Sequence, residues 1–151
     1  MLYEGSMLQV YEHKTLSRSL VQAHGLKQSQ RNCVQDLKER RAKRFGTKDF
    51  ESASHRFDQV VYLASDSPCG IDIEVVDPDL NVQKLSQRFF GFEVSDHRSF
   101  YEHWVQAETL VKAKGLSLLK VLRQKSFEEN VQIEWLSDNV VVGYWIAGES
   151  T

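Results

Sequence analysis

Residues 71–76, Ile-Asp-Ile-Glu-Val-Val, alternate β-branched apolar side chains with two carboxylates. A β-strand points successive side chains to opposite faces, so the alternation predicts a strand with one apolar and one acidic face. Neighbouring carboxylates repel each other unless a cation neutralises them, and a hard divalent cation with oxygen ligands is a common solution. A metal site is therefore one interpretation of Asp72 and Glu74. The exposed polar face of a half-buried strand is the other, and these two residues alone favour it.

The pattern of elements around this strand predicts an α+β fold. Strands are expected at residues 60–64, 71–76, 131–135 and 140–147, and helices at about 80–90 and from Ser95 or Asp96 to Gly115. The turn at 65–68 suggests that the first two strands form a hairpin, and the turn at 137–139 suggests a second hairpin at the end of the chain. This order places helices against a mainly antiparallel sheet.

The longer expected helix carries an apolar stripe. Its members, at spacings of four, three and four, are Phe100, Trp104, Ala107 and Val111. Glu108 and Lys112 flank the stripe one turn apart, a spacing that commonly gives a weak surface ion pair. Glu108 could instead complete a set of three carboxylates with Asp72 and Glu74, and Lys112 could then reach a phosphate.

Residues 8–50 are polar and mostly compatible with helix, and we assign no structure to residues 1–6. The segment ends in a cation-rich run at residues 38–44. A solvated helix face, a phosphate contact and a nucleic-acid patch are all open interpretations of this run. Only Phe45 interleaves it with an aromatic ring, which argues mildly against binding of single strands. The net charge is −2, so affinity for phosphate must come from local clustering.

Composition places the chain among ordinary globular proteins. Its 151 residues, 41% of them hydrophobic and 26% charged, suit one domain and exclude a large multi-domain enzyme. Cys33 and Cys69 are too few for a disulfide framework or a cysteine-based zinc site, and suit a reducing compartment. The first residues do not form a signal peptide and no apolar run is long enough for a membrane span, so we expect a cytoplasmic protein.

Four motifs together resemble the 4′-phosphopantetheinyl transferase superfamily, in its larger, Sfp-like branch. They are Gly70-Ile71-Asp72-Ile73-Glu74, then Arg88-Phe89-Phe90 with Glu93, then Trp104-(x3)-Glu108-(x3)-Lys112, and then the run to Leu118. The resemblance covers residues 54–118 well and the terminal hairpin more loosely. It implies a pseudo-dimer of two similar halves with coenzyme A between them. Here residues 1–64 would be a shortened first half, and 65–151 would carry the motifs.

The resemblance also implies roles for individual residues. Asp72, Glu74 and Glu108 would bind Mg²⁺, and Glu108 would also deprotonate, directly or through water, a serine of an acyl or peptidyl carrier protein. Lys112 would neutralise charge on the phosphate under attack. The serine oxygen would attack the β-phosphorus of coenzyme A, so that 4′-phosphopantetheine moves and 3′,5′-ADP leaves. Positioning and charge neutralisation supply most of such catalysis.

Contacts with coenzyme A are implied for residues earlier in the chain. His55 follows Ser54 at the place of the family's Ser-His-Ser motif, and Lys38, Arg41 and Arg44 match cations near the 3′-phosphate of coenzyme A. The expected partners are thus coenzyme A and a carrier protein, with no nucleic acid and no membrane. The cleft would be closed by these residues alone or by a second copy of the chain.

Three positions depart from the family pattern. Ala107 stands where the family has the lysine of its Lys-Glu pair, Arg56 replaces the second serine of Ser-His-Ser, and Thr109 replaces a small Ala or Ser. Alanine cannot tune the neighbouring glutamate or hold phosphate. Ala107 and the short first half therefore motivate an alternative function, a catalytically reduced homologue that binds coenzyme A or a carrier protein without transfer.

Overall fold

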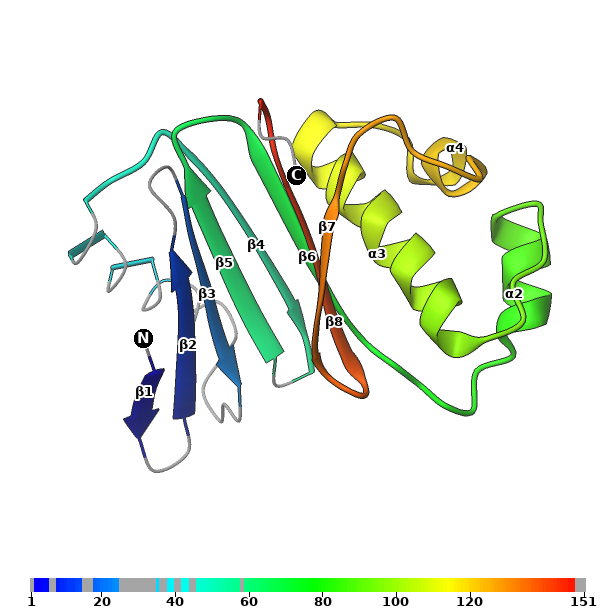
Figure 1. The fold of residues 1–151 in the computed structure, drawn as a ribbon, viewed down its shortest axis with the longest axis horizontal. Helices are drawn as coiled ribbons and strands as arrows, with labels where there is room; N and C mark the ends of the chain where they lie inside the picture. Colours follow the sequence, from blue (N-terminus) through cyan, green and yellow to red (C-terminus); the bar gives the residue numbers. More distant parts are fainter. Residues whose placement is uncertain are drawn as a thin grey trace.

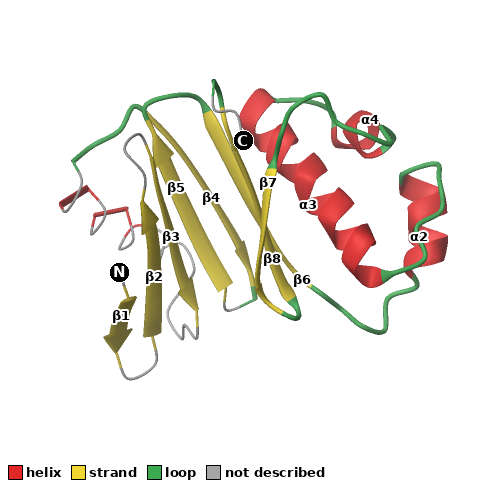
Figure 2. Cartoon of the chain, in the orientation of Figure 1, coloured by secondary structure: helices red, strands yellow, loops and turns green. Residues whose placement is uncertain are grey.

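The computed structural model describes residues 2–5, 8–14, 18–24, 35, 38–39, 42–43, 46–57 and 59–148, the first three ranges by their backbone. Figure 1 shows the strands on one side of the molecule and the labelled helices α2, α3 and α4 on the other, and Figure 2 shows the same arrangement by element type. The strands are β1 (Leu2–Gly5), β2 (Leu8–Lys14), β3 (Arg18–His24), β4 (Phe50–Arg56), β5 (Gln59–Ser65), β6 (Cys69–Val75), β7 (Gln132–Ser137) and β8 (Val140–Ile146). The helices are α2 (Val82–Phe89), α3 (His97–Lys114) and α4 (Leu118–Leu122).

The strands form two antiparallel sheets, which confirms the predicted α+β class. The first sheet has the order β1-β2-β3-β5-β4, and the second has the order β6-β8-β7. The helix α3 packs on β6 and β8 of the second sheet. The terminal hairpin is confirmed, since β7 pairs with β8. Among the helices that the structure describes, none has both the length and the apolar character that a membrane crossing needs.

The two sheets meet at their edge strands, where β4 and β6 lie side by side. The backbone N–H of Ile71 donates to the Ser52 hydroxyl at 3.0 Å, and that of Ile73 donates to the Ser54 hydroxyl at 3.3 Å. Both strands advance by two residues between these bonds, so they run parallel. Serine side chains thus satisfy β6 backbone donors that face the edge of the first sheet.

The predicted hairpin between residues 60–64 and 71–76 is wrong. The strand β5 pairs with β3 and β4, whereas β6 pairs with β8. The chain reaches β5 from β4 through a tight turn that includes Phe57, whose φ is 54°. The connection at 65–68 instead carries the chain from one sheet to the other. Turn residues indicate where the chain reverses but not which strand the next one joins.

The interpretation of residues 8–50 as mostly helical is also wrong in part. Strands β2 and β3 occupy much of its first half, and β1 precedes them within residues 1–6, for which the sequence predicts no structure. Pairing of β3 with β5 supplies the tertiary context that decides strand over helix here. Residues 35, 38, 39, 42 and 43 are helical.

The helix α3 has the boundaries and the buried face that its sequence predicts. The side chain of Asp96 accepts the backbone N–H of Ser99 at 2.8 Å, and Gly115 ends the helix with φ at 67°. Phe100 and Ala107 are buried in the apolar cluster beneath the helix, and Trp104 and Val111 pack against that cluster. Burial of this stripe fixes the rotation of α3 and therefore the directions of its polar side chains.

Glycines on β6 and β8 let α3 approach the sheet closely. A Cβ on Gly70 would lie 2.7 Å from the Thr109 carbonyl oxygen and 2.7 Å from the Ala113 Cβ. A Cβ on Gly143 would lie 2.8 Å from the Thr109 hydroxyl oxygen. Only glycine fits at either position with the helix at this distance.

Candidate functional site

The acidic face of β6 points toward α3 and β4, not toward solvent. Asp72 and Glu74 are 4% and 6% exposed, and they share this face with Gly70, against which α3 packs. The opposite face carries Ile71 and Ile73, which are buried in an apolar cluster with β5 and β8. The interpretation of the two carboxylates as an exposed polar face is therefore wrong. Buried carboxylates need charge partners or a bound cation.

Asp72 is held by residues from both neighbouring elements. The Ser54 hydroxyl donates to Asp72 Oδ1 at 3.0 Å, and Lys112 Nζ lies 3.2 Å from the same oxygen. Lys112 also donates to the carbonyl oxygen of Ala53 at 3.4 Å. The lysine therefore links α3 to β6 and β4. Its spacing to Glu108 suggested only a surface ion pair within the helix.

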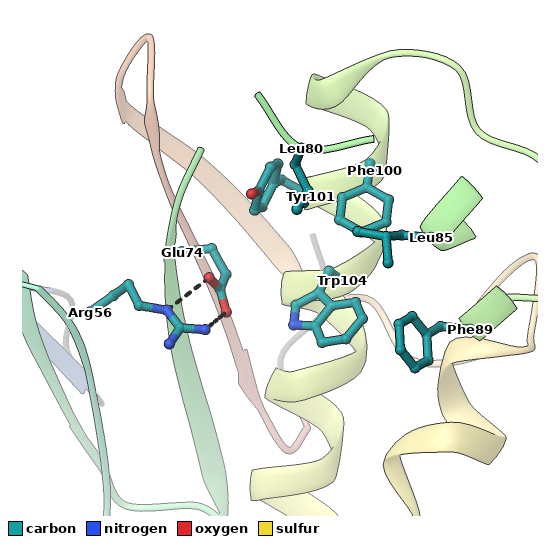
Figure 3. Close-up of a pocket in the computed structure, with 8 residues that line it drawn as sticks. All are labelled: Arg56, Glu74, Leu80, Leu85, Phe89, Phe100, Tyr101 and Trp104. Carbon is teal, nitrogen blue, oxygen red and sulfur yellow. Dashed lines mark hydrogen bonds and ion pairs between the residues drawn. The ribbon is translucent and has the colours of Figure 1, made fainter. Parts of the chain in front are cut away.

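Glu74 is paired with Arg56, which extends from the end of β4. Arg56 Nε lies 3.1 Å from Glu74 Oε2, and Arg56 Nη2 lies 3.2 Å from Glu74 Oε1. Figure 3 shows this two-pronged ion pair, in which the planar guanidinium faces both carboxylate oxygens. Both oxygens of Glu74 are thus engaged.

The three carboxyl groups of Asp72, Glu74 and Glu108 share one electrostatic environment. Burial is the main cause that raises the pKa of each, and the charge of Asp72 further raises the pKa of Glu74 and of Glu108. Lys112 and Arg56 oppose these rises in pKa. We refer to the three acidic residues with Lys112 and Arg56 as the carboxylate cluster. It brings together groups from β4, β6 and α3.

One oxygen of the cluster is left without a partner. Asp72 Oδ2 is buried and accepts no hydrogen bond from the residues that the structure describes. Buried polar atoms are nearly always satisfied, and a carboxylate oxygen is a preferred ligand of hard divalent cations, so this atom fits a metal ion. Within the described part of the chain, however, no three His, Cys, Asp or Glu side chains are already arranged to hold a metal ion. Arg56 on Glu74 and Lys112 on Asp72 hold the positions that such an ion would need.

An apolar pocket of about 170 Å³ adjoins the cluster. Figure 3 shows the Arg56–Glu74 ion pair on one side of it and the rings of Phe89, Phe100 and Trp104 on the other. The rings come from α2 and α3, whose packing includes an edge-on contact between Phe89 and Trp104. The pocket is suited to an apolar group whose attached polar part reaches the ion pair.

Two of the remaining predicted contacts of coenzyme A, His55 and Lys38, do not join this cluster. Ser52, Ser54 and Arg56 face β6, so strand alternation puts His55 on the other face of β4, where it is exposed. Lys38 is exposed and forms an ion pair with Glu51 at 2.8 Å. Arg41 and Arg44 lie outside the described residues.

Two residues of β4 that contact the β6 carboxylates, Ser54 and Arg56, were not predicted from the sequence to do so. The sequence predicted no strand before residue 60, so the side chains of residues 54–56 had no expected common direction. Had 50–56 been recognised as a strand, the alternation of Ser52, Ser54 and Arg56 would have placed three polar side chains on one face.

Comparison of the chain with models of protein families gives no match, and comparison with curated proteins gives none either. The site is therefore interpreted from its own chemistry together with the motif resemblance.

Proposed function

We propose that this chain transfers 4′-phosphopantetheine from coenzyme A to a serine hydroxyl of an acyl or peptidyl carrier protein, as Sfp-like 4′-phosphopantetheinyl transferases do. The observation that carries the proposal is the meeting of the buried Asp72 and Glu74 on β6 with Glu108 and Lys112 on α3 in one cluster. These are the residues that the motif resemblance assigns to a common site. Phosphoryl transfer needs positive charge at the transferred group, which Lys112 and a cation held by the carboxylates would supply.

The arrangement of the sheets gives further support. A pseudo-dimer needs two similar halves, and the first sheet supplies more strands before Gly70 than the sequence suggested. The two sheets adjoin where β4 meets β6, and the cluster lies at that junction. A co-substrate bound between two halves would reach the cluster from this junction.

The donor set is chemically suited to Mg²⁺, and Asp72, Glu74 and Glu108 are the residues that would hold it. When bound, the ion would neutralise charge on the pyrophosphate of coenzyme A and polarise its P–O bonds. The unpartnered oxygen of Asp72 is the atom most ready to serve as a ligand, because it requires no displacement of another group.

In this proposal Glu108 accepts the proton of the acceptor serine, and Lys112 neutralises negative charge on the phosphate. A raised pKa makes Glu108 a better proton acceptor than an ordinary carboxylate, so it can take the proton from the acceptor serine. The serine oxygen then forms a bond to the β-phosphorus, and the bond from that phosphorus to 3′,5′-ADP breaks. Lys112, held beside Asp72, would donate to the phosphate oxygens as charge develops there.

The direct test measures the mass of carrier proteins after incubation with the full chain, coenzyme A and Mg²⁺. We expect one or more apo carriers in a panel to gain the mass of 4′-phosphopantetheine, and Lys112→Met and Glu108→Gln to lose most of this activity. Gln106→Glu is a matched control on an adjacent turn of α3. The proposal fails if no carrier gains mass while a known transferase modifies the same panel in parallel.

Two observations favour the alternative of a homologue that binds coenzyme A or a carrier without transfer. Ala107 is fully buried in the apolar cluster under α3, and Arg56 occupies both oxygens of Glu74. A lysine at 107 would have to bury its charge or distort the helix packing, so we expect Ala107→Lys to lower the melting temperature and restore no activity. Tight binding of coenzyme A without transfer to any carrier would decide for this alternative.

A further inference from the structure

Arg56 is the group that departs most from what a divalent-cation site requires. Its guanidinium bonds both oxygens of Glu74, at 3.1 Å and 3.2 Å. A metal ion that took Glu74 as a ligand would compete with the guanidinium for the same lone pairs. The serine that the resemblance would place at this position carries no charge and would leave Glu74 open.

The burial of the two partners determines which one can move. The Arg56 side chain is 51% exposed, whereas that of Glu74 is 8% exposed. Arg56 lies at the end of β4 beside a turn, and its long side chain can rotate into water without leaving a cavity in the core. Glu74 is fixed on a strand that is buried on both faces. If the ion pair breaks, Arg56 is therefore the side chain that moves away, and Glu74 stays in place.

The negative charges of the carboxylate cluster explain why the cationic side chain of Arg56 lies beside Glu74 in the metal-free chain. Asp72 and Glu74 lie on one face of β6, where the charges of Asp72 and Glu108 both raise the pKa of Glu74 and the charge of Asp72 raises that of Glu108. Lys112 engages Asp72 and leaves Glu74 to Arg56. Without either cation a buried carboxylate would be uncompensated, which is strongly destabilising.

We propose that Arg56 is an internal cation that competes with a divalent metal ion for Glu74 and so sets the metal affinity of the carboxylate cluster. It stabilises the metal-free chain by neutralising Glu74, and it must leave that carboxylate when a metal ion binds. The unpartnered Asp72 Oδ2 is then the first ligand available, and Glu74 becomes available after Arg56 rotates away. The proposal rests on the proposed function for the assignment of the metal ligands.

The test uses the full chain with Mn²⁺ or Mg²⁺ alone, without coenzyme A. Free Mn²⁺ is measured by electron paramagnetic resonance during a titration, and Mg²⁺ by the shift of the melting temperature relative to EDTA. Arg56→Ser and the longer, neutral Arg56→Gln remove the competing charge. Arg123→Ser removes an exposed arginine at the end of α4 and is the matched control.

We expect both Arg56 variants to bind Mn²⁺ at least about tenfold more tightly than the unmodified chain, since a hydrogen-bonded charge pair no longer has to be broken. They should also melt at a lower temperature in EDTA and show a larger upward shift with Mg²⁺. A residue that only held the fold together would lower the melting temperature without strengthening metal binding.

Three results would overturn the proposal: unchanged or weaker Mn²⁺ binding in both Arg56 variants, an equal gain in Arg123→Ser, or no Mn²⁺ binding by any of the chains. The proposed function is tested separately, by the transfer of 4′-phosphopantetheine to a carrier protein. If the unmodified chain modifies a carrier but the Arg56 variants bind Mn²⁺ no better, the role of Arg56 is wrong and the function stands. If the variants bind Mn²⁺ more tightly and no chain transfers, the function is wrong and the role of Arg56 stands.

Discussion

Gly70 controls how closely α3 approaches β6, and replacing it with alanine is expected to disturb both the fold and the carboxylate cluster. The added Cβ would lie 2.7 Å from the Ala113 Cβ and 2.7 Å from the carbonyl oxygen of Thr109. Ordinary contacts between carbon atoms are about 3.5–4.0 Å, so the helix must retreat by roughly 1 Å. One obstacle is a backbone oxygen inside a helix, which cannot rotate away.

The expected cost follows from this geometry. Overpacking a rigid core typically costs about 1–3 kcal/mol, and the backbone obstacle places Gly70→Ala at about 2–3 kcal/mol of unfolding free energy. For a chain of this size such a loss lowers the melting temperature by roughly 5–10 °C. Retreat of α3 would also carry Lys112 Nζ out of hydrogen-bond range of Asp72 Oδ1, from which it now lies 3.2 Å.

Urea unfolding of single and double variants measures the effect and identifies the obstacle. In Gly143→Ala the new Cβ would meet the hydroxyl oxygen of Thr109 at 2.8 Å, an atom that Thr109→Ala removes. Thr109→Ala should therefore relieve Gly143→Ala but leave the cost of Gly70→Ala unchanged, where the backbone oxygen remains. Unaltered stability of Gly70→Ala, or equal relief of both glycine variants, would refute the reasoning.

Three further predictions concern single side chains. Burial lowers the pKa of His103, whose Nε2 donates to the Leu122 carbonyl at 2.7 Å, so the unfolded chain binds a proton at higher pH than the native chain does. The free energy of unfolding should thus fall as the pH drops below about 6.5 toward the lowered pKa of His103. The variant His103→Gln keeps a hydrogen-bond donor, and its urea midpoint should not fall with pH over this range. Burial raises the pKa of the Cys69 thiol to about 11, so alkylation of Cys69 by iodoacetamide near neutral pH should be slow in buffer and fast in urea, and rapid native labelling would contradict its burial. The exposed pair of Lys38 with Glu51 is worth less than about 1 kcal/mol, so Lys38→Met should barely change the melting temperature. If Lys38 contributes to the proposed binding of coenzyme A, calorimetry should show that binding weakened several-fold, and unchanged affinity would exclude this role.

Elements with a strong local signal were predictable from the sequence. The helix α3 has a capping aspartate, a glycine stop and an apolar stripe, and the structure places all three as expected. The terminal hairpin has two β-branched runs around a polar turn, and its strands do pair. In both cases residues within a few positions of each other decide the outcome, so one sequence is enough to reveal it.

Other features depended on partners far away in the chain. The strand β6 was recognised, but its pairing with β8 and its contact with β4 were not, because many strands can satisfy the same backbone donors. Strands β2 and β3 have weak patterns and are decided by the sheet that they join. The burial of the acidic face could not be predicted from residues 71–76. Their alternation is the same whether water or a packed helix covers that face of the strand.

The sequence by itself determined the carboxylates on one face of a strand, the rotation of a helix that carries Glu108 and Lys112, and the order of motifs that suggests phosphopantetheinyl transfer. Only the tertiary structure decided that this acidic face is buried against α3, that Lys112 forms an ion pair with Asp72, and that Arg56 from β4 forms one with Glu74. The physical reason is that periodicity fixes the direction of side chains within one element, whereas charge compensation depends on which elements pack together. In this chain two glycines and a pair of adjoining strand edges bring those elements into contact.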